Sequence, residues 1–313
     1  MCKLLVVFGA TGQQGGSIIS HVLDDTELSK QYKIRGITRD PSSSAVEALK
    51  KRGVDVAKAD MTDPSSLSSV LKGAHTVFFL TAPVMGADAK NEEFAQGKGV
   101  VDVAVAEGIQ YMIFSTLPHV TRISGGKYTK VAAFDAKAEI EDYIRTLPIK
   151  SAFFSPASFM QNFQRIMAPY PSDNGTFVLA RLVSPATQLP LIDTVGDAGK
   201  YVGAILADPD KYEGKVFCSA SAVYTMTEIV DIMSKVYGKT VRYEQIPEEA
   251  FRQQLRFSGP YAEGLIEMML YQQDFGYYGP KTKELVAWAA ENARGRVHTL
   301  EEYLKKNPLV ALQ

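Results

Sequence analysis

The sequence predicts an α/β fold in which helices cover both faces of a doubly wound parallel sheet. Up to Phe154, short apolar segments alternate with longer amphipathic ones, the pattern of consecutive strand–helix–strand units. The apolar segments are rich in Val, Ile and Phe and alternate little with polar residues, as expected of strands buried on both faces. A glycine-rich turn follows the first strand and opens a helical segment. Together these observations predict a Rossmann-type domain.

The expected strands and helices follow one another in strict order along this part of the chain. The strands are Lys3–Phe8, Lys33–Thr38, Asp55–Lys58, Thr76–Leu80, Tyr111–Thr116 and Ser151–Phe154. Between the strands lie amphipathic segments with apolar residues at helical spacing, such as Gly15–Leu23, Ala45–Arg52, Glu92–Glu107 and Ala132–Thr146.

The rhythm changes after Phe163, and the turn-rich segment Ala168–Gly175 marks the exit to a second region. We therefore expect residues 1–163 to form the Rossmann domain and residues 164–313 a smaller C-terminal α/β region that borders a cleft for a substrate or partner. The stretch near 195–220 is expected to return to the main sheet. The elements expected here are strands at Thr176–Leu182, Gln188–Ile192 and Val216–Cys218, helices at Val195–Ala207 and Thr227–Val236, and a largely helical tail from Pro247.

Composition argues against several classes of function. The 313 residues carry a formal net charge of −1 without a long basic run, so direct nucleic-acid binding is not expected. No apolar stretch approaches the ~18–20 residues of a membrane span, and no signal peptide is visible, so we expect a cytoplasmic or nuclear protein. The two cysteines and four histidines are scattered, so no metal site is expected; they are Cys2, Cys218, His21, His75, His119 and His298.

The strongest functional signal joins the first strand to the first helix. Its first glycine permits a tight turn, its second lets backbone approach a pyrophosphate, and its third lets helix and strand pack closely. Amide groups at the start of the helix favour phosphate charge. The GxxGxxG spacing is typical of short-chain dehydrogenase-like proteins, and the segment predicts dinucleotide binding by Gly9, Ala10, Thr11, Gly12, Gln13, Gln14 and Gly15.

Residues after the second and third strands bear on the identity of the dinucleotide. Arg39 stands where a planar guanidinium can pair with the 2′-phosphate of NADP(H). A shift of one residue would instead place Asp40 at the ribose and favour NAD(H). We expect NADP(H), with NAD(H) as the alternative. Asp60 and Met61 follow the third strand and either contact the adenine or form an ordinary helix-capping turn.

The catalytic pair of short-chain dehydrogenases is incomplete in this chain. Those enzymes use a tyrosine and a lysine four residues later, with the tyrosine relaying a proton. The candidate lysine is Lys137, and Ala133 occupies the tyrosine position. Tyr128 lies too far upstream to share that helical turn. Lys137 therefore remains as the candidate catalytic group.

Taken together, the sequence resembles the NmrA-like family of atypical short-chain dehydrogenase-like proteins. The resemblance runs almost from end to end and rests on Val7–Gly16, Thr38–Pro41, Phe134–Arg145, Ser155–Phe163, Val195–Gly214 and Phe275–Gly279. It implies a Rossmann domain, a small C-terminal α/β region and a cleft between them. It also implies cofactor contacts from the loop at 9–14 and from Arg39, Asp60, Met61, Thr81, Ala82, Pro83, Lys137, Phe159 and Asn162.

The resemblance also implies a role for Lys137 and reveals two departures. A lysine at this position would donate to the nicotinamide ribose hydroxyls, and isoflavone-reductase-like relatives use it as an acid or base. Redox-sensing members often have a polar residue where Ala82 stands and a histidine where Ala133 stands. This chain therefore differs from those members at two positions near the expected cofactor.

Several other groups have two readings. Ser115 and Thr116 end the fifth strand and are either catalytic hydroxyls or helix caps. His119 follows in a loop that either reaches the cleft or is incidental. The aromatic cluster from Tyr271 to Tyr278 is expected to pack in the core rather than to stack on bases.

Two functions from different classes fit these observations. The favoured one is a regulator that senses the redox state of NADP(H) and acts through a protein partner such as a transcription factor. It follows from the resemblance, the missing tyrosine and the lack of DNA-binding features. The alternative is an NADPH-dependent reductase of a carbonyl or conjugated alkene, with Lys137 or a cleft tyrosine as proton donor.

Overall fold

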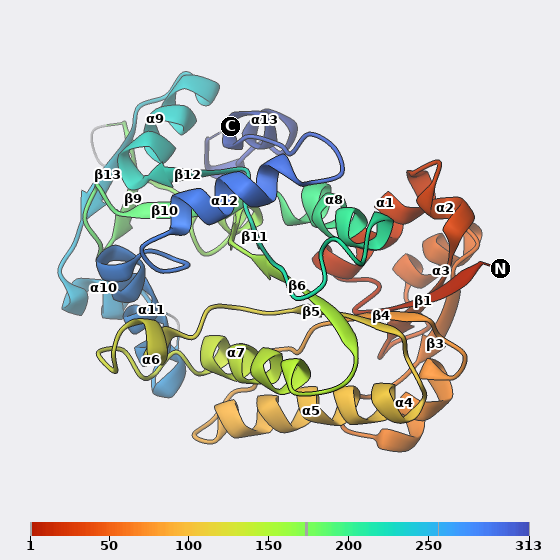
Figure 1. The fold of residues 1–313 in the computed structure, drawn as a ribbon. Helices are drawn as coiled ribbons and strands as arrows, with labels where there is room; N and C mark the ends of the chain where they lie inside the picture. The colour runs from red at the N-terminus through yellow and green to blue at the C-terminus, as the bar shows by residue number, and fades with distance from the viewer. Residues whose placement is uncertain (1, 173–174, 256, 313) are drawn as a thin grey trace.

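The computed structural model describes residues 2–172, 175–255 and 257–312, and its centre is a seven-stranded parallel sheet (Figure 1). The strand order is β11-β6-β5-β4-β1-β2-β3, so the order of connection reverses between β1 and β4. This doubly wound sheet confirms the predicted fold class. Its strands are β1 (Lys3–Phe8), β2 (Tyr32–Thr38), β3 (Asp55–Lys58), β4 (Thr76–Phe79), β5 (Tyr111–Ser115), β6 (Lys150–Pro156) and β11 (Val216–Ser219).

Helices cover both faces of the sheet. α1 and α8 pack together on one face, and α4, α5 and α7 lie on the other (Figure 1). Alternate residues of β1 enter two separate hydrophobic cores, Leu5 and Val7 on one face and Val6 and Phe8 on the other. The helices of this part are α1 (Gln13–Asp24), α2 (Leu28–Gln31), α3 (Ser44–Lys51), α4 (Pro64–Leu71), α5 (Ala89–Ala106), α6 (Val120–Ile123), α7 (Ala132–Arg145) and α8 (Thr194–Ala207).

A smaller region, at the upper left of Figure 1, contains two three-stranded sheets. One has the order β12-β10-β7 and the other β13-β9-β8. The predicted strands Thr176–Leu182 and Gln188–Ile192 are confirmed as β9 and β10, and Asp173 and Asn174 of the expected turn lie outside the described residues. The strands are β7 (Ser158–Phe159), β8 (Tyr170–Pro171), β9 (Phe177–Arg181), β10 (Gln188–Ile192), β12 (Ala222–Thr225) and β13 (Val241–Gln245).

The remaining helices confirm that the chain after Pro247 is largely helical. A 3-10 turn, η1 (Met160–Gln164), follows β7, and η2 (Val310–Leu312) ends the described chain. The helices are α9 (Met226–Tyr237), α10 (Glu248–Gln254), α11 (Pro260–Phe275), α12 (Thr282–Glu291) and α13 (Leu300–Lys306).

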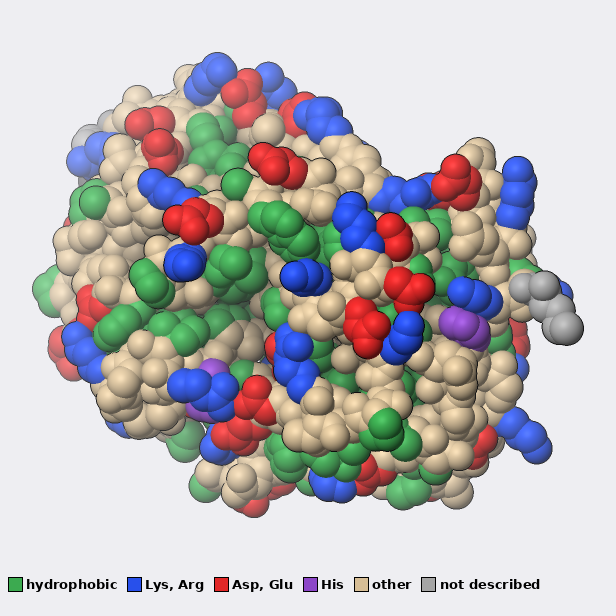
Figure 2. All heavy atoms as spheres, viewed as in Figure 1, with side chains coloured by type: hydrophobic (Ala, Val, Ile, Leu, Met, Phe, Trp, Pro, Cys, Tyr) green, Lys and Arg blue, Asp and Glu red, His purple; other side chains and the backbone are tan. Residues whose placement is uncertain are grey.

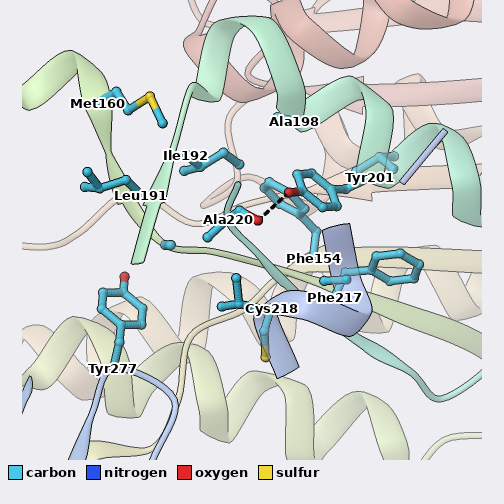
Figure 3. Close-up of a cluster of buried hydrophobic side chains, with 14 of the residues drawn as sticks. Phe154, Met160, Leu191, Ile192, Ala198, Tyr201, Phe217, Cys218, Ala220 and Tyr277 are labelled. Atoms are coloured by element: carbon cyan, nitrogen blue, oxygen red, sulfur yellow. Dashed lines mark hydrogen bonds between the residues drawn. The ribbon is translucent and has the colours of Figure 1, made fainter. Parts of the chain in front are cut away.

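The two parts of the chain share one hydrophobic core. Strand β11 pairs in parallel with β6 at the edge of the main sheet. Tyr201 of α8 donates a hydrogen bond to the carbonyl of Ala220 at 2.8 Å, and it packs near Phe154 of β6 and Phe217 of β11 (Figure 3). The boundary at residue 163 thus remains a predicted division, across which the packing is continuous.

The face that the described residues present in Figure 2 has no large basic patch. Acidic and basic side chains are interspersed over that face (Figure 2). Among the described residues, none of the helices combines the length and apolarity needed to cross a bilayer.

Candidate dinucleotide-binding site

The loop between β1 and α1 has the backbone conformation for which glycines are needed. Gly9 has a φ of 65°, in the left-handed region that favours glycine. A Cβ on Gly15 would lie only 2.3 Å from the carbonyl oxygen of Gly9, so this glycine allows α1 to approach β1. Gly12 is exposed, and a Cβ there would lie 3.2 Å from the same oxygen. Gly9 and Gly15 therefore shape the loop, while Gly12 faces its open side.

The first turn of α1 fits a phosphate group. The first amide groups of a helix have no partner within the helix. Gly12 supplies no side-chain cap, and the first turn contains no acidic residue to neutralise the positive end of the helix dipole. The turn also lies beside β1 and β4, where the connection order of the sheet reverses. In such sheets ligands bind in the crevice at this point.

On the β2 side of the crevice, Arg39 and Asp40 are in different situations. The Asp40 carboxylate accepts hydrogen bonds from the Ser42 backbone N–H at 2.9 Å and from its hydroxyl at 2.6 Å. Asp40 is therefore engaged in the turn after β2. Arg39 is exposed, and within the described part of the chain its side chain has no hydrogen bond or ion pair. Its guanidinium is thus available for a ligand.

Asp60 is engaged in a turn after β3. Its carboxylate accepts hydrogen bonds from the backbone N–H and hydroxyl of Thr62 at 2.9 and 2.7 Å, which hold the pKa of Asp60 below its usual value. The nearby charge of Arg39 lowers this pKa further. Asp60 therefore forms a turn before α4, although Asp63 supplies the N-cap itself. Met61 is half-buried and packs on the core beneath α5.

On the β4 side, the candidate residues lead to a buried group that the sequence analysis missed. Thr81 is buried, whereas Ala82 and Pro83 are exposed. The Thr81 hydroxyl donates to Oε1 of Glu93 at 2.7 Å. Glu93 is only 1% exposed and lies on α5.

Lys137 is buried and paired to the same carboxylate. Its side-chain Nζ donates to Oε1 of Glu93, and the exposed fractions of the two side chains are 9% and 1%. Burial lowers the pKa of Lys137 below its usual value, while the adjacent Glu93 carboxylate raises it. Glu93, Thr81 and Lys137 therefore form one buried polar network between α5, the end of β4 and α7.

The sequence did contain a signal for Glu93. The buried residues of α5 recur at helical spacing, and Glu93 is at the first of these positions, followed by Gly97, Val100, Val101 and Ala104. A carboxylate on an apolar stripe must find a partner because its burial without one is costly. The pattern would have indicated a buried ion pair, although the partner could not be read from it.

The alternative proton donors all have partners. The Tyr128 phenol donates to the Asp274 carboxylate at 2.7 Å, toward α11. The Ser115 hydroxyl donates to the side-chain oxygen of Gln14 at 2.8 Å, so it links β5 to α1 rather than capping a helix. His119 caps α6 by accepting a hydrogen bond from a backbone N–H, and its Nδ1 lies 3.0 Å from the Asp135 carboxylate.

Thr116 and the aromatic cluster have structural roles. The Thr116 hydroxyl contacts the backbone carbonyl of Lys137 at 3.4 Å. Tyr271, Tyr277 and Tyr278 are buried, and the Tyr278 phenol donates to the backbone carbonyl of Ser155 at 2.7 Å. This confirms that the cluster packs in the core rather than stacking on bases.

Phe159 and Asn162 follow β6 at the same edge of the sheet, where they belong to the smaller region. Phe159 pairs in parallel with Ile192 of β10, and both Phe159 and Asn162 are half-buried. The backbone carbonyl of Asn162 accepts from Met167 at 2.8 Å. The cofactor contacts predicted for these two residues remain predictions.

A separate carboxylate–histidine cluster lies at the start of α8. Asp193, Asp197 and His298 bring their ligand atoms within 4.8 Å of one another. Asp193 accepts a hydrogen bond from Gln161 at 2.7 Å and Asp197 accepts one from Lys200 at 2.7 Å, whereas Nδ1 of His298 is buried without a hydrogen-bond partner among the described residues. The His298 backbone N–H donates to the Asp197 carboxylate at 2.8 Å and so joins α8 to the C-terminal segment.

The sheet and its glycine loop define a protein of the Rossmann-type α/β class. A model of the NmrA-like family matches residues 1–304, and the chain belongs to this family. An NmrA-like family domain-containing protein of Dictyostelium discoideum is 31% identical, with 98% of each chain covered. The NmrA-like family domain-containing oxidoreductase FrzB of Cladobotryum sp is 29% identical over 79% of this chain and 77% of its own length.

Solved structures give the same fold. The negative transcriptional regulator NmrA, in complex with NADP, superposes with a TM-score of 0.82 at 21% identity. The match covers 98% of this chain and 95% of that one, and NmrA has also been solved in complex with NAD. At this level of identity the likeness establishes the common fold.

Proposed function

We propose that this protein binds a nicotinamide dinucleotide, NADP(H) in preference to NAD(H), and acts as a redox-cofactor-sensing regulator through a protein partner. The observation that carries the proposal is the environment of Lys137. The helical turn before it presents Ala133 instead of a phenol, and its own ammonium group is bound by Glu93. This arrangement supports cofactor binding without a free proton donor.

The phosphate loop and Arg39 support the choice of cofactor. The uncapped first turn of α1 would hold the pyrophosphate through backbone N–H groups. Arg39 would pair with the 2′-phosphate, because Asp40 is already engaged by Ser42. The related NmrA structures with NADP and NAD bound support either dinucleotide as a ligand.

The residues on the β4 side would orient the nicotinamide half. When bound, the nicotinamide ring supplies hydride chemistry and two forms that differ in charge. Lys137 would present the N–H groups that Glu93 does not engage, and Thr81 would present its hydroxyl oxygen as an acceptor. The Ser115 bond to Gln14 fixes β5 against the phosphate loop. These contacts favour a rigid site. A rigid site suits a protein that signals whether the oxidised or the reduced cofactor is bound.

The test is NADPH consumption across a panel of ketones, quinones and enones. We expect NADPH to bind and no efficient turnover, because general-acid catalysis typically contributes ~10²–10⁴-fold. The proposal of a regulator would be wrong if turnover exceeded ~1 s⁻¹ and this turnover were lost in Lys137→Ala while NADPH still bound.

A second candidate is an NADPH-dependent reductase of a carbonyl or conjugated alkene, and two observations favour it. FrzB and several other relatives carry the name oxidoreductase. Burial lowers the pKa of Lys137, which makes its ammonium group a better acid than an exposed lysine. The same substrate panel separates the candidates, with the dependence of turnover on Lys137 as the deciding result.

A further inference from the structure

The Glu93–Lys137 pair is the most deeply buried lysine–carboxylate or arginine–carboxylate pair in the described part of the chain. Its side chains are 9% and 1% exposed, whereas the next most buried such pair, Lys200 with Asp197, has a lysine that is 17% exposed. A buried ion pair is weak evidence for stability, because desolvation of both charges offsets their attraction. The presence of the Glu93–Lys137 pair at this site is therefore not explained by stability alone.

The pair lies on the side of the crevice opposite to Arg39. A dinucleotide crosses the carboxyl edge of such a sheet with its pyrophosphate at the glycine loop. Arg39 and Asp60 follow β2 and β3, on one side of the loop, and would contact the adenosine half. Thr81 follows β4 on the other side and is hydrogen-bonded to Glu93. The nicotinamide half would therefore extend toward Thr81, Glu93 and Lys137.

Charge distinguishes the two redox forms at this end of the cofactor. The oxidised nicotinamide ring carries one positive charge and the reduced ring carries none. A lone carboxylate beside the ring would favour the oxidised form, and a lone ammonium would favour the reduced form. Glu93 and Lys137 present both charges in direct contact, so their fields largely cancel.

We propose that Glu93 is a positioning residue that holds Lys137 at the nicotinamide half and cancels its charge, so that this pair sets the relative affinity for oxidised and reduced cofactor. The inference rests on the proposed dinucleotide binding and deepens it. The ratio of the affinities for oxidised and reduced cofactor would then depend on the carboxylate of Glu93 on α5 and the ammonium group of Lys137 on α7.

The test measures dissociation constants for NADP⁺ and NADPH in the full-length protein and in Glu93→Gln, Lys137→Gln and the double variant. Glu93→Gln is expected to weaken NADP⁺ relative to NADPH by about tenfold, and Lys137→Gln is expected to shift the ratio by about tenfold in the opposite direction. The double variant, which is neutral like the intact pair, is expected to restore the original ratio. If Glu93→Gln does not fold, the difference between Lys137→Gln and the double variant isolates the charge of Glu93.

Lys98→Gln is the matched control. Lys98 lies on the same helix as Glu93, on the exposed surface, and pairs with Asp102 at 2.5 Å. Its substitution removes the same charge as Lys137→Gln and is expected to leave the ratio unchanged. An unchanged ratio in every variant, or an equal shift in Lys98→Gln, would refute the inference. A full-length protein that binds neither form would refute the proposed function, and the inference with it.

Discussion

The two ends of the candidate site are built by different means. On the β1–β2 side, a contiguous glycine loop and the exposed Arg39 present backbone N–H groups and one guanidinium. On the β4–β6 side, Glu93 and Lys137 come from separate helices and meet in the interior. The first end recognises phosphate through a local chain conformation, and the second depends on tertiary packing. The turn is closed by neighbouring residues, whereas the Glu93–Lys137 pair forms only where α5 and α7 pack together.

The largest expected effect concerns the glycine loop on the β1–β2 side of the site. Gly12→Val should abolish detectable dinucleotide binding, because the side chain would fill the space through which the pyrophosphate approaches the backbone. The fold should survive, since a Cβ at Gly12 meets only the Gly9 carbonyl at 3.2 Å. Calorimetry and circular dichroism measure the two properties. Binding retained in a folded variant would place the cofactor elsewhere.

Gly15→Ala provides the contrast within the same loop. Its Cβ would lie 2.3 Å from the Gly9 carbonyl oxygen, so this variant should lose stability rather than only binding. Equal stability of Gly12→Val and Gly15→Ala would show that the two glycines do not have separate roles.

The next effect concerns the packed end. Glu93→Ala should lower the free energy of unfolding by about 3–5 kcal/mol, because it leaves the buried ammonium of Lys137 without its partner. Urea unfolding measures the loss. The exposed Asp102, partner of Lys98, offers the control, and Asp102→Ala should have little effect. Similar losses in the two variants would mean that burial does not distinguish the pairs.

A smaller effect is expected at Arg39, where a substitution tests whether the site prefers NADP(H) to NAD(H). Arg39→Ala should weaken NADP(H) by about 10- to 150-fold, from the loss of roughly 1.5–3 kcal/mol in charge-assisted hydrogen bonds. NAD(H) affinity should hardly change. Calorimetry that finds equal losses for both cofactors would contradict the assignment of Arg39 and point to Asp40.

The smallest effect concerns the contact that joins the two ends. Ser115→Ala removes the hydrogen bond to Gln14 and should reduce cofactor affinity or stability by only about 0.5–1.5 kcal/mol. Gln14→Ala should give the same loss, and the double variant should add nothing further. Fully additive losses in this cycle would show that Ser115 and Gln14 act independently.

The sequence predicted the main sheet well, for a physical reason. Strands buried on both faces have continuous apolar runs, so β1 was predicted with the bounds that it has in the structure. The bounds of β3 were also predicted correctly, although none of its four residues is buried. The smaller sheets were only partly foreseen, because β7 and β8 each contain two residues and carry no periodic pattern. α4 was not predicted either.

The candidate site divides in the same way. The conformation of the glycine loop followed from its sequence because the contacts that close the turn, between Gly9, Gly12 and Gly15, are local. The pairing of Glu93 could not be read from the sequence, because its partner Lys137 lies 44 positions away and separations of this kind leave no motif. The partner of Tyr128 could not be read from the sequence either, because Asp274 is 146 positions away.

The return of the chain to the main sheet has a consequence for modularity. Residues 1–163 on their own would leave the edge of β6 unpaired, and an open strand edge invites association with other chains. They would also uncover α1, whose Ser17 accepts a hydrogen bond from the Gly199 backbone N–H of α8 at 3.0 Å. The helix at the centre of the phosphate site is therefore supported by residues from the far half of the chain. A functional exchange of residues 1–163 between proteins would therefore have to include α8 and β11.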